Sequence, residues 1–358
     1  MSETTRLHRR NPVRYHLLAT ASSAVLLASV LLAQSADAAA DGQPTVWIEV
    51  GGTLDQMADG DARWLPPNLT PSLDNPPPSP FGKMPAMGFG EDLKVSFSPD
   101  DSDWVFSASI RYGRAQSGPK HSHDQSYKFN IITTSGVPIK YNLTNWDFAN
   151  AAQKSRSTHA ILDFQAGKDM GLGMFGSKST FSAGIRIANL NESADGHLTA
   201  LVSAPAKYDP GEVGHKASFA VSHSFTGIGP SLSWDGSTPV AGTLKEGFSF
   251  DWGANAALLF GKQKTRVLLQ TADTRYFPTH QTVLTHSTNT PPVRDKTVIV
   301  PNIGGFAGLS LRLPNAKISL GYRADFFFGA VDGGLLTSQK ETRGFYGPFA
   351  NVSIGIGG

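Results

Sequence analysis

The chain of 358 residues contains no cysteine, so it can form neither a disulfide bond nor a thiolate metal site. Charged residues are also scarce, at 17%, whereas glycine is abundant, with 37 residues. Only one long apolar run is present, at residues 17–33, and no later segment reaches the ~18 uninterrupted apolar residues of a membrane helix. These absences argue against a small disulfide-stabilised domain and against a bundle of membrane helices.

The formal net charge of +2 comes from the N-terminus alone. Residues 1–38 hold four arginines and two acids, and removing them from 31 Lys+Arg and 29 Asp+Glu leaves 27 of each. The remainder of the chain is therefore formally neutral. We expect no nucleic-acid partner, because nucleic-acid binding requires a basic surface.

The first 38 residues have the three-part order of a secretory signal peptide. A cationic segment, 1–16, precedes the apolar run, and Ala36-Asp37-Ala38 fits the small-x-small rule for cleavage. An uncleaved membrane anchor is the alternative, since 17 apolar residues nearly span a bilayer. The sequence favours cleavage and predicts two parts, a signal peptide at 1–38 and an exported domain at 39–358.

The rest of the chain repeats a two-residue alternation of apolar with small or polar side chains, the pattern of a strand with two different faces. The clearest instance places Phe248, Phe250, Trp252, Ala254, Ala256, Leu258 and Phe260 on one face. Similar runs predict ten strands, with an uncertainty of two, at 45–54, 91–98, 103–114, 158–168, 179–190, 216–235, 246–261, 297–313, 317–330 and 343–357. The run at 216–235 changes phase near 227–230, which predicts a bulge or bend, and segment 265–276 either extends its predecessor or pairs separately.

The segments between these runs alternate strictly between long and short. Long polar segments lie at 55–90, 115–157, 191–215, 262–296 and 331–342, and shorter ones at 99–102, 168–178, 235–243 and 314–317. This is the order of an all-β, antiparallel, up-and-down transmembrane β-barrel with long external loops and short periplasmic turns. A proline-rich stretch, 66–80, cannot form ladder strand and is expected in an external loop.

An exported soluble β-sandwich is the alternative, because its strands also alternate around a shared core. Aromatic residues near the predicted strand ends favour the barrel, as in the girdles of membrane barrels: Trp104, Tyr112, Trp234, Tyr322 and Tyr346. The alternation of loop lengths also favours it. We therefore expect the outer membrane, with its lipid and lipopolysaccharide, to be the surroundings of the mature chain.

If the apolar faces meet lipid, the polar faces must line the lumen. An Arg or Lys facing lipid at mid-depth would cost about 2–4 kcal/mol. The side chains expected to point inward are Glu49, Lys94, Arg111, Asp163, Gln165, Arg186, Asp251, Asn255, Arg312, Arg323 and Asp325. They form either a paired network that stiffens the wall or a charged constriction that selects solutes.

Three functions remain open at this point. The first is a porin-like barrel for passive passage of small hydrophilic solutes, and the second is a non-conducting structural or adhesive barrel. The third is a barrel enzyme, for which His159 and Asp163 share a face but lie roughly 13 Å apart along one strand. We expect no enzyme, no cofactor and no metal: His121 and His123 are interpreted as solvated side chains, and Lys262, Lys264 and Arg266 as a solvated rim rather than a lipopolysaccharide site.

Several segments resemble the Legionella major outer membrane protein family, described as pore-forming. They are DLKVSFSPDDSDWVFSASIRYGR (92–114), GIGPSLSWDG (227–236), FSFDWGANAALLFG (248–261), VPNIGGFAGLSLRLPNAKISLGYRADFFFGAVDGG (300–334) and GFYGPFANVSIGIG (344–357). The resemblance implies a barrel and porin-like transport and supplies no catalytic residues. Outer-membrane barrels commonly end in an aromatic residue read by the barrel assembly machinery, an expected partner, whereas this chain ends Ile356-Gly357-Gly358.

Overall fold

The computed structural model describes residues 46–58, 86–99, 102–124, 146–170, 178–243, 246–276, 282–289, 292–333, 338 and 340–357. The predicted signal peptide at 1–38 and the proline-rich stretch 66–80 lie outside these ranges. The part of the chain that the structure describes contains no candidate for a membrane-spanning helix.

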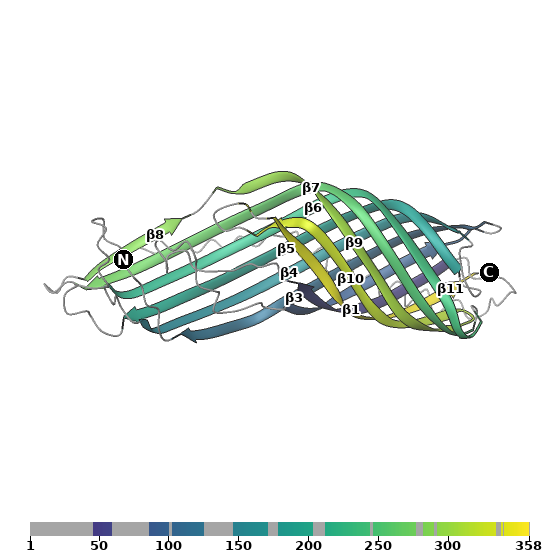
Figure 1. Ribbon diagram of the computed structural model, residues 1–358, viewed down its shortest axis with the longest axis horizontal. Coiled ribbons are helices and arrows are strands. Elements are labelled where there is room, and N and C mark those ends of the chain that lie inside the picture. Colours follow the sequence, from purple (N-terminus) through teal and green to yellow (C-terminus); the bar gives the residue numbers. More distant parts are fainter. Residues whose placement is uncertain are drawn as a thin grey trace, which may run out of the picture.

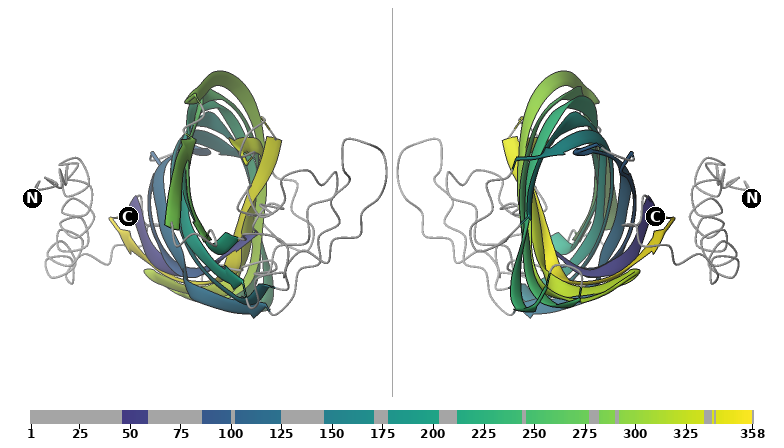
Figure 2. Two further views of the ribbon diagram at one scale, coloured as in Figure 1. Left: turned by 90° about the vertical axis from the view of Figure 1, so that its left-hand side faces the viewer. Right: turned by 90° about the vertical axis from the view of Figure 1, so that its right-hand side faces the viewer.

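The described chain is all-β. Its strands are β1 (Val46–Ala58), β2 (Ala86–Phe97), β3 (Trp104–Asp124), β4 (Trp146–Asp169), β5 (Lys178–Val202), β6 (Glu212–Gly242), β7 (Gly247–Tyr276), β8 (Thr282–Asn289), β9 (Arg294–Leu313), β10 (Ala316–Asp332) and β11 (Lys340–Ile356). Neighbours pair antiparallel, and the β1–β11 and β6–β7 pairings close the sheet into a ring of ten strands, which Figure 2 shows end-on. The prediction of an up-and-down barrel of about ten strands is confirmed.

The eleventh element, β8, continues the line of β9 along β7. Strand β9 pairs with β7 up to Arg294↔Thr265, and β8 resumes the pairing at Asn289↔Leu269. The sequence has four residues between Asn289 and Arg294 but three between Thr265 and Leu269, so the two strands are offset by one residue, as across a β-bulge. Pro292, just before β9, has no N–H to donate to a ladder, which explains why the strand is interrupted there.

Strands β3 to β8 extend well past the end of the closed barrel, on the left in Figure 1. The bounds of all five predicted long loops are partly wrong. Strand fills 115–124, 146–157, 191–202, 212–215, 262–276, 282–289 and 294–296, and at the other two loops it fills 55–58, 86–90, 331–332 and 340–342. Segment 265–276 belongs to β7, the first of the two possibilities that the sequence left open. The turn expected at 235–243 is also shorter, since β6 continues to Gly242 and Thr243 N–H donates to the Glu246 carbonyl (2.7 Å). The part of β3–β8 beyond the closed ring is called the extension below.

Large apolar side chains cover the outer wall of the closed barrel. Exposed outward residues include Val95, Phe97, Trp104, Phe106, Phe164, Phe181, Ile185, Ile228, Leu232, Trp234, Phe248, Phe250, Leu258, Phe260, Ile299, Ile303, Leu309, Leu313, Ile318, Leu320, Tyr322, Phe326, Phe328 and Val352. This apolar belt far exceeds the patches that soluble proteins expose. On β7 it runs from Phe248 to Phe260, about 40 Å along the strand and about 28 Å in height at a tilt of ~45°, close to the thickness of a bilayer core.

Above the belt, the two faces of the wall exchange polarity. On β6, Ile228, Leu232 and Trp234 are exposed on the outer face, whereas Phe219, Val221 and Phe225 are buried on the inner face. The bulge predicted near 227–230 is wrong, because the β5–β6 register continues without a shift from Phe225 to Trp234. The apolar side chains thus face outward on the lower wall and inward on the upper wall, the pattern expected where a membrane barrel continues into a sheet with an ordinary core inside and water outside.

Candidate functional site

The inward side chains of the barrel form layers along its axis, and this layered interior is the candidate site. The structure places all eleven predicted lumen residues on the inner face. Hydrogen bonds, ion pairs or strand register connect them there: Glu49, Lys94, Arg111, Asp163, Gln165, Arg186, Asp251, Asn255, Arg312, Arg323 and Asp325.

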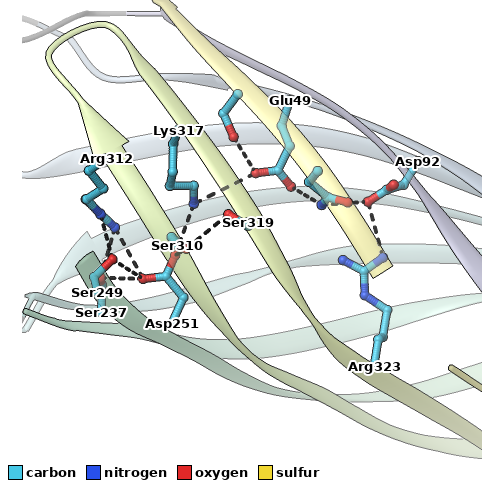
Figure 3. Close-up of polar contacts among 12 residues, drawn as sticks. Glu49, Asp92, Ser237, Ser249, Asp251, Ser310, Arg312, Lys317, Ser319 and Arg323 are labelled. Carbon is cyan, nitrogen blue, oxygen red and sulfur yellow. Dashed lines mark hydrogen bonds and ion pairs between the residues drawn. The ribbon is translucent and has the colours of Figure 1, made fainter. Parts of the chain in front are cut away.

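The lowest layer, nearest the short turns, is a polar network centred on two carboxylates (Figure 3). Asp251 accepts hydrogen bonds from Ser237 (2.5 Å) and Ser310 and pairs with Arg312 (3.4 Å). Lys317 links it to Glu49, at 3.4 Å from Asp251 and 4.0 Å from Glu49. Since these partners come from β1, β6, β7, β9 and β10, the network ties opposite parts of the wall together.

The same network continues towards the next layer through Asp92. Asn351 donates to Glu49 (2.9 Å) and to Asp92 (3.1 Å), and Arg323 also binds Asp92 (3.2 Å). Lys94 lies opposite Glu49 in the β1–β2 register, and Gln165 bonds to Ser231 and Ser233 on β6. Cross-wall pairing of this kind stiffens the lumen, as the first of the two sequence interpretations requires.

The second layer is a compact cluster around Arg186, which is only 2% exposed. Its guanidinium makes a bidentate contact with Asp163, with N–O distances of 2.6 and 2.9 Å. It also donates to Asn255 (2.7 Å) and to Asn302 across the lumen. A buried arginine with all these partners satisfies most of its donors, which is the condition for keeping a charge away from water.

Arg111 joins this cluster from β3, the strand next to β4 and its Asp163. It contacts Asp325 at 2.5 Å and Asp163 at 3.8 Å, so Asp163 lies between two guanidinium groups. Because β3 and β10 are not neighbours in the sheet, the Arg111–Asp325 contact crosses the interior. The Arg186 cluster therefore occupies the middle of the lumen as well as its wall.

The third layer is apolar. Buried hydrophobic side chains from eight of the ten barrel strands form one cluster directly above Arg186: Ala115, Ile161, Ala188, Leu190, Phe225, Leu259, Val300, Phe327, Ala330, Val331 and Phe345. Phe225, Leu259, Val300 and Phe327 are 0% exposed. This apolar layer was not predicted from the sequence, which placed only small and polar residues in the lumen.

Beyond the apolar layer, polar side chains return at the base of the extension. Arg343 binds Glu192 and Glu341 (3.2 Å to Glu341), and Asp332 binds Arg294 (2.9 Å) and Lys296 (3.6 Å). Further out, the inner face becomes apolar again in a second cluster of Ala194, Phe219, Val221, Val267 and Leu269. This second cluster comes from the neighbouring strands β5, β6 and β7 and lies beyond the closed ring, so it coats the inner face of the extension rather than the closed lumen.

His159 has a different partner from the one considered at the sequence level. Its Nε2 lies 3.6 Å from Asp55 Oδ2, and its ring centroid lies 4.1 Å from that of Phe345. Gly113 makes this contact possible, because a Cβ there would come within 2.1 Å of Asp55 Oδ2 and 2.2 Å of His159 Cε1. The pair lines a pocket together with Arg111, Arg323 and Asp325, between the Arg186 cluster and Phe345 of the apolar layer.

Several members of the network were missed by sequence reasoning: Asp92, Lys317, Asn302 and Asn351. Each could have been found from its position in the two-residue alternation of its strand, because residues an even number of positions apart lie on one face. Asp92 shares a face with Lys94 in this way, and Lys317 shares one with Arg323. Lys317 was instead placed where the predicted turn 314–317 meets the predicted strand 317–330 and was not counted among the lumen residues. Among the residues described, no group of three or more His, Asp or Glu side chains is arranged to hold a metal ion.

His223, on the inner face of the extension, gives a pH prediction. Burial, followed by the positive charges of Arg343 and Arg294, lowers the pKa of His223 from 6.5 to about 4, against an opposing effect of Asp332. An unfolded extension binds more protons than the folded one between these values, so its stability falls as pH drops from 6.5 towards 4, by about 1.4 kcal/mol per pH unit.

We expect amide exchange in β6 and β7 around Val221 and Val267, once corrected for intrinsic exchange chemistry, to accelerate as the pH is lowered from 6.5 towards 4. The Nδ1 atom of His223 lies 3.1 Å from Thr265 Oγ1. The variant His223→Gln keeps a polar side chain there but does not titrate, and should lose most of the acceleration. Equal acceleration in both proteins would contradict the assignment to His223.

Comparison with known proteins gives no family. No family model matches the sequence, and no curated protein is similar to it in sequence. Among solved structures, the chain matches the outer membrane protease OmpT from Escherichia coli at 8% identity and a TM-score of 0.37, covering 87% of this chain and 94% of that one. It matches the toluene transporter TodX from P. putida at 11% identity and a TM-score of 0.28 (89% and 91% covered), and a major outer membrane protein from Thermus thermophilus at 10% and 0.25 (74% and 99% covered). Scores this low carry neither an activity nor a substrate to this chain, whose architecture rests on its own strand pairing.

Proposed function

We propose that this chain is an outer-membrane β-barrel that does not form an open pore and instead anchors its extension at the cell surface. The apolar belt, about as tall as a bilayer core, supports the membrane location. The N-terminal signal peptide pattern supports export. The short turns, the start of β1 and the end of β11 lie on one side, as in barrels whose termini face the periplasm. Assembly would then involve the barrel assembly machinery.

The observation that carries this proposal is the apolar layer. Eight strands contribute to it, and Phe225, Leu259, Val300 and Phe327 are fully buried in it, so these side chains offer water no polar partner. Hydrophobic constrictions block ions by excluding water even where a polar lumen leads up to them. The Arg186 cluster lies directly beneath and fills the lumen with paired charges rather than free ones.

A porin-like barrel is the second candidate. The charged lower network and the pocket beside Asp55 favour it, because both are polar features of a lumen. The resemblance to the Legionella major outer membrane protein family also points to pore formation, and membership of that family is part of this second proposal. Neither candidate is an enzyme.

Conductance of the refolded mature chain in a planar lipid bilayer separates the two candidates. If the barrel is closed, we expect no current steps. Folding of the protein used is verified by its gel mobility, which is that of a compact form and changes on heating. Discrete steps from the same folded protein would contradict it and establish the pore. Failure of the protein to enter bilayers or detergent micelles would contradict the membrane location itself.

A further inference from the structure

Three cations stand in a row on the outer face of β7, immediately above the apolar belt. They are Lys262, Lys264 and Arg266. All three project outward because they lie an even number of positions after Phe260 on the same strand and therefore share its outer face. Sequence reasoning placed them just beyond a strand end, which is wrong, because β7 continues to Tyr276. The ladders to β6 and β9 hold their backbone, so the three cations form a row of fixed spacing.

These cations have no ion-pair partner among the residues that the structure describes. Asp295 on β9 lies opposite Lys264 in register, yet the two form no ion pair within 4.0 Å. Lys154, another exposed cation of the extension, is paired differently, at 3.9 Å from Asp195. The three cations carry a formal charge of +3, and Asp295 reduces the sum to +2. This remaining charge has no counter-charge in this part of the chain.

The neighbours of the row on β6 are uncharged and can form hydrogen bonds. Thr226 lies opposite Lys262, and Ser224 lies opposite Lys264. Further along the sheet, Asn189 of β5 donates to Thr226 (2.8 Å). Cations surrounded by hydroxyl and amide groups are the donor set that phosphate oxygens bind.

Directly below the row, the wall is apolar and exposed. Phe260 is 48% exposed, and its neighbours in register are Ile228 (51%) and Ile299 (59%). From Lys262 to Arg266 the row extends about 13 Å along the strand and about 9 Å in height at a tilt of ~45°. That height suits a headgroup layer above a hydrocarbon core, so one ligand could place acyl chains on the belt and phosphates on the row.

We propose that Lys262, Lys264 and Arg266 form a binding site for a phosphorylated lipid of the outer leaflet, with its acyl chains against Phe260, Ile228 and Ile299. The inference rests on the proposed location in the outer membrane. The ligand class follows from the juxtaposition of uncompensated cations and exposed apolar side chains on one face of β7. The site holds the barrel at a fixed depth, because moving it would pull the phosphates away from the cations.

The test is binding of diphosphorylated lipid A to the refolded mature chain in neutral detergent, counted by native mass spectrometry. A cation near an anionic lipid surface contributes ~1 kcal/mol, so the variant Lys262→Gln, Lys264→Gln should bind about 30-fold more weakly. The matched control is Lys154→Gln, Lys216→Gln, which removes two exposed lysines of the extension and should bind like the unchanged protein. Equal losses in both variants would show a general charge effect and overturn the site.

Two further ligands separate the lipid from its parts. Lipid A without phosphates should bind weakly and equally to all three proteins, and inorganic phosphate should not displace the phosphorylated lipid. The proposal would be overturned if the variant Lys262→Gln, Lys264→Gln also bound the phosphate-free lipid A more weakly than the unchanged protein does. Displacement of the phosphorylated lipid by inorganic phosphate would overturn it as well. Failure of the proposed membrane location would look different, because no variant would then enter detergent micelles or vesicles.

Discussion

Replacing Phe225 and Leu259 with serine should turn a silent barrel into a conducting one. Both side chains are fully buried in the apolar layer and come from the neighbouring strands β6 and β7. Removing them opens space at the level that excludes water, and the two hydroxyls give water hydrogen-bonding partners there. We expect discrete current steps in planar bilayers where the unchanged protein gives none.

The matched control changes the nearby residues Ile228 and Leu258, which are 51% and 41% exposed and face lipid. It introduces the same two serines on the same two strands but outside the lumen, so it should remain silent. The loss of a buried Phe or Leu side chain costs about 2–5 kcal/mol each, so Leu259→Ser alone serves if the double variant folds poorly. Silence of both folded interior variants would mean that another layer closes the barrel.

Replacing Arg186 with methionine should cause the largest loss of stability of any single change in the lumen. Asp163 would keep only the 3.8 Å contact with Arg111, while Asn255 and Asn302 would lose their donor. Breaking a buried ion pair by removing one partner costs about 3–5 kcal/mol, because the other charge stays buried. The measurement is the free energy of unfolding of the refolded barrel in detergent, from a reversible denaturant titration.

Two variants test this explanation. Arg186→Met combined with Asp163→Asn removes both charges and should recover a large part of the loss. Arg312→Met removes a cation whose side chain is 24% exposed and whose partner Asp251 also contacts Lys317, so it should cost clearly less. If the single and double variants at Arg186 lose equal stability, packing rather than charge would be the cause.

The residue pattern was sufficient to predict the architecture of the closed barrel. Alternation on β7 from Phe248 to Phe260 marks a wall with lipid on one side, and strict alternation of long and short connections requires antiparallel neighbours. The two-residue alternation also predicted that all eleven polar residues point inward, because the free energy of a charged side chain facing lipid is too high. These conclusions need only the local period of a strand and the free energy of transfer from water to lipid.

What fills the lumen, and where the apolar belt ends, became evident only from the folded chain. Phe225 and Leu259 look like breaks in the pattern until the closed wall brings residues from eight strands to one level. Likewise, the phase change near 227–230 resembled a bulge, because a sequence pattern cannot distinguish a shifted backbone from a changed environment. Partners such as Arg111 and Asp325 lie 214 positions apart, and only barrel closure with its particular register brings them into contact.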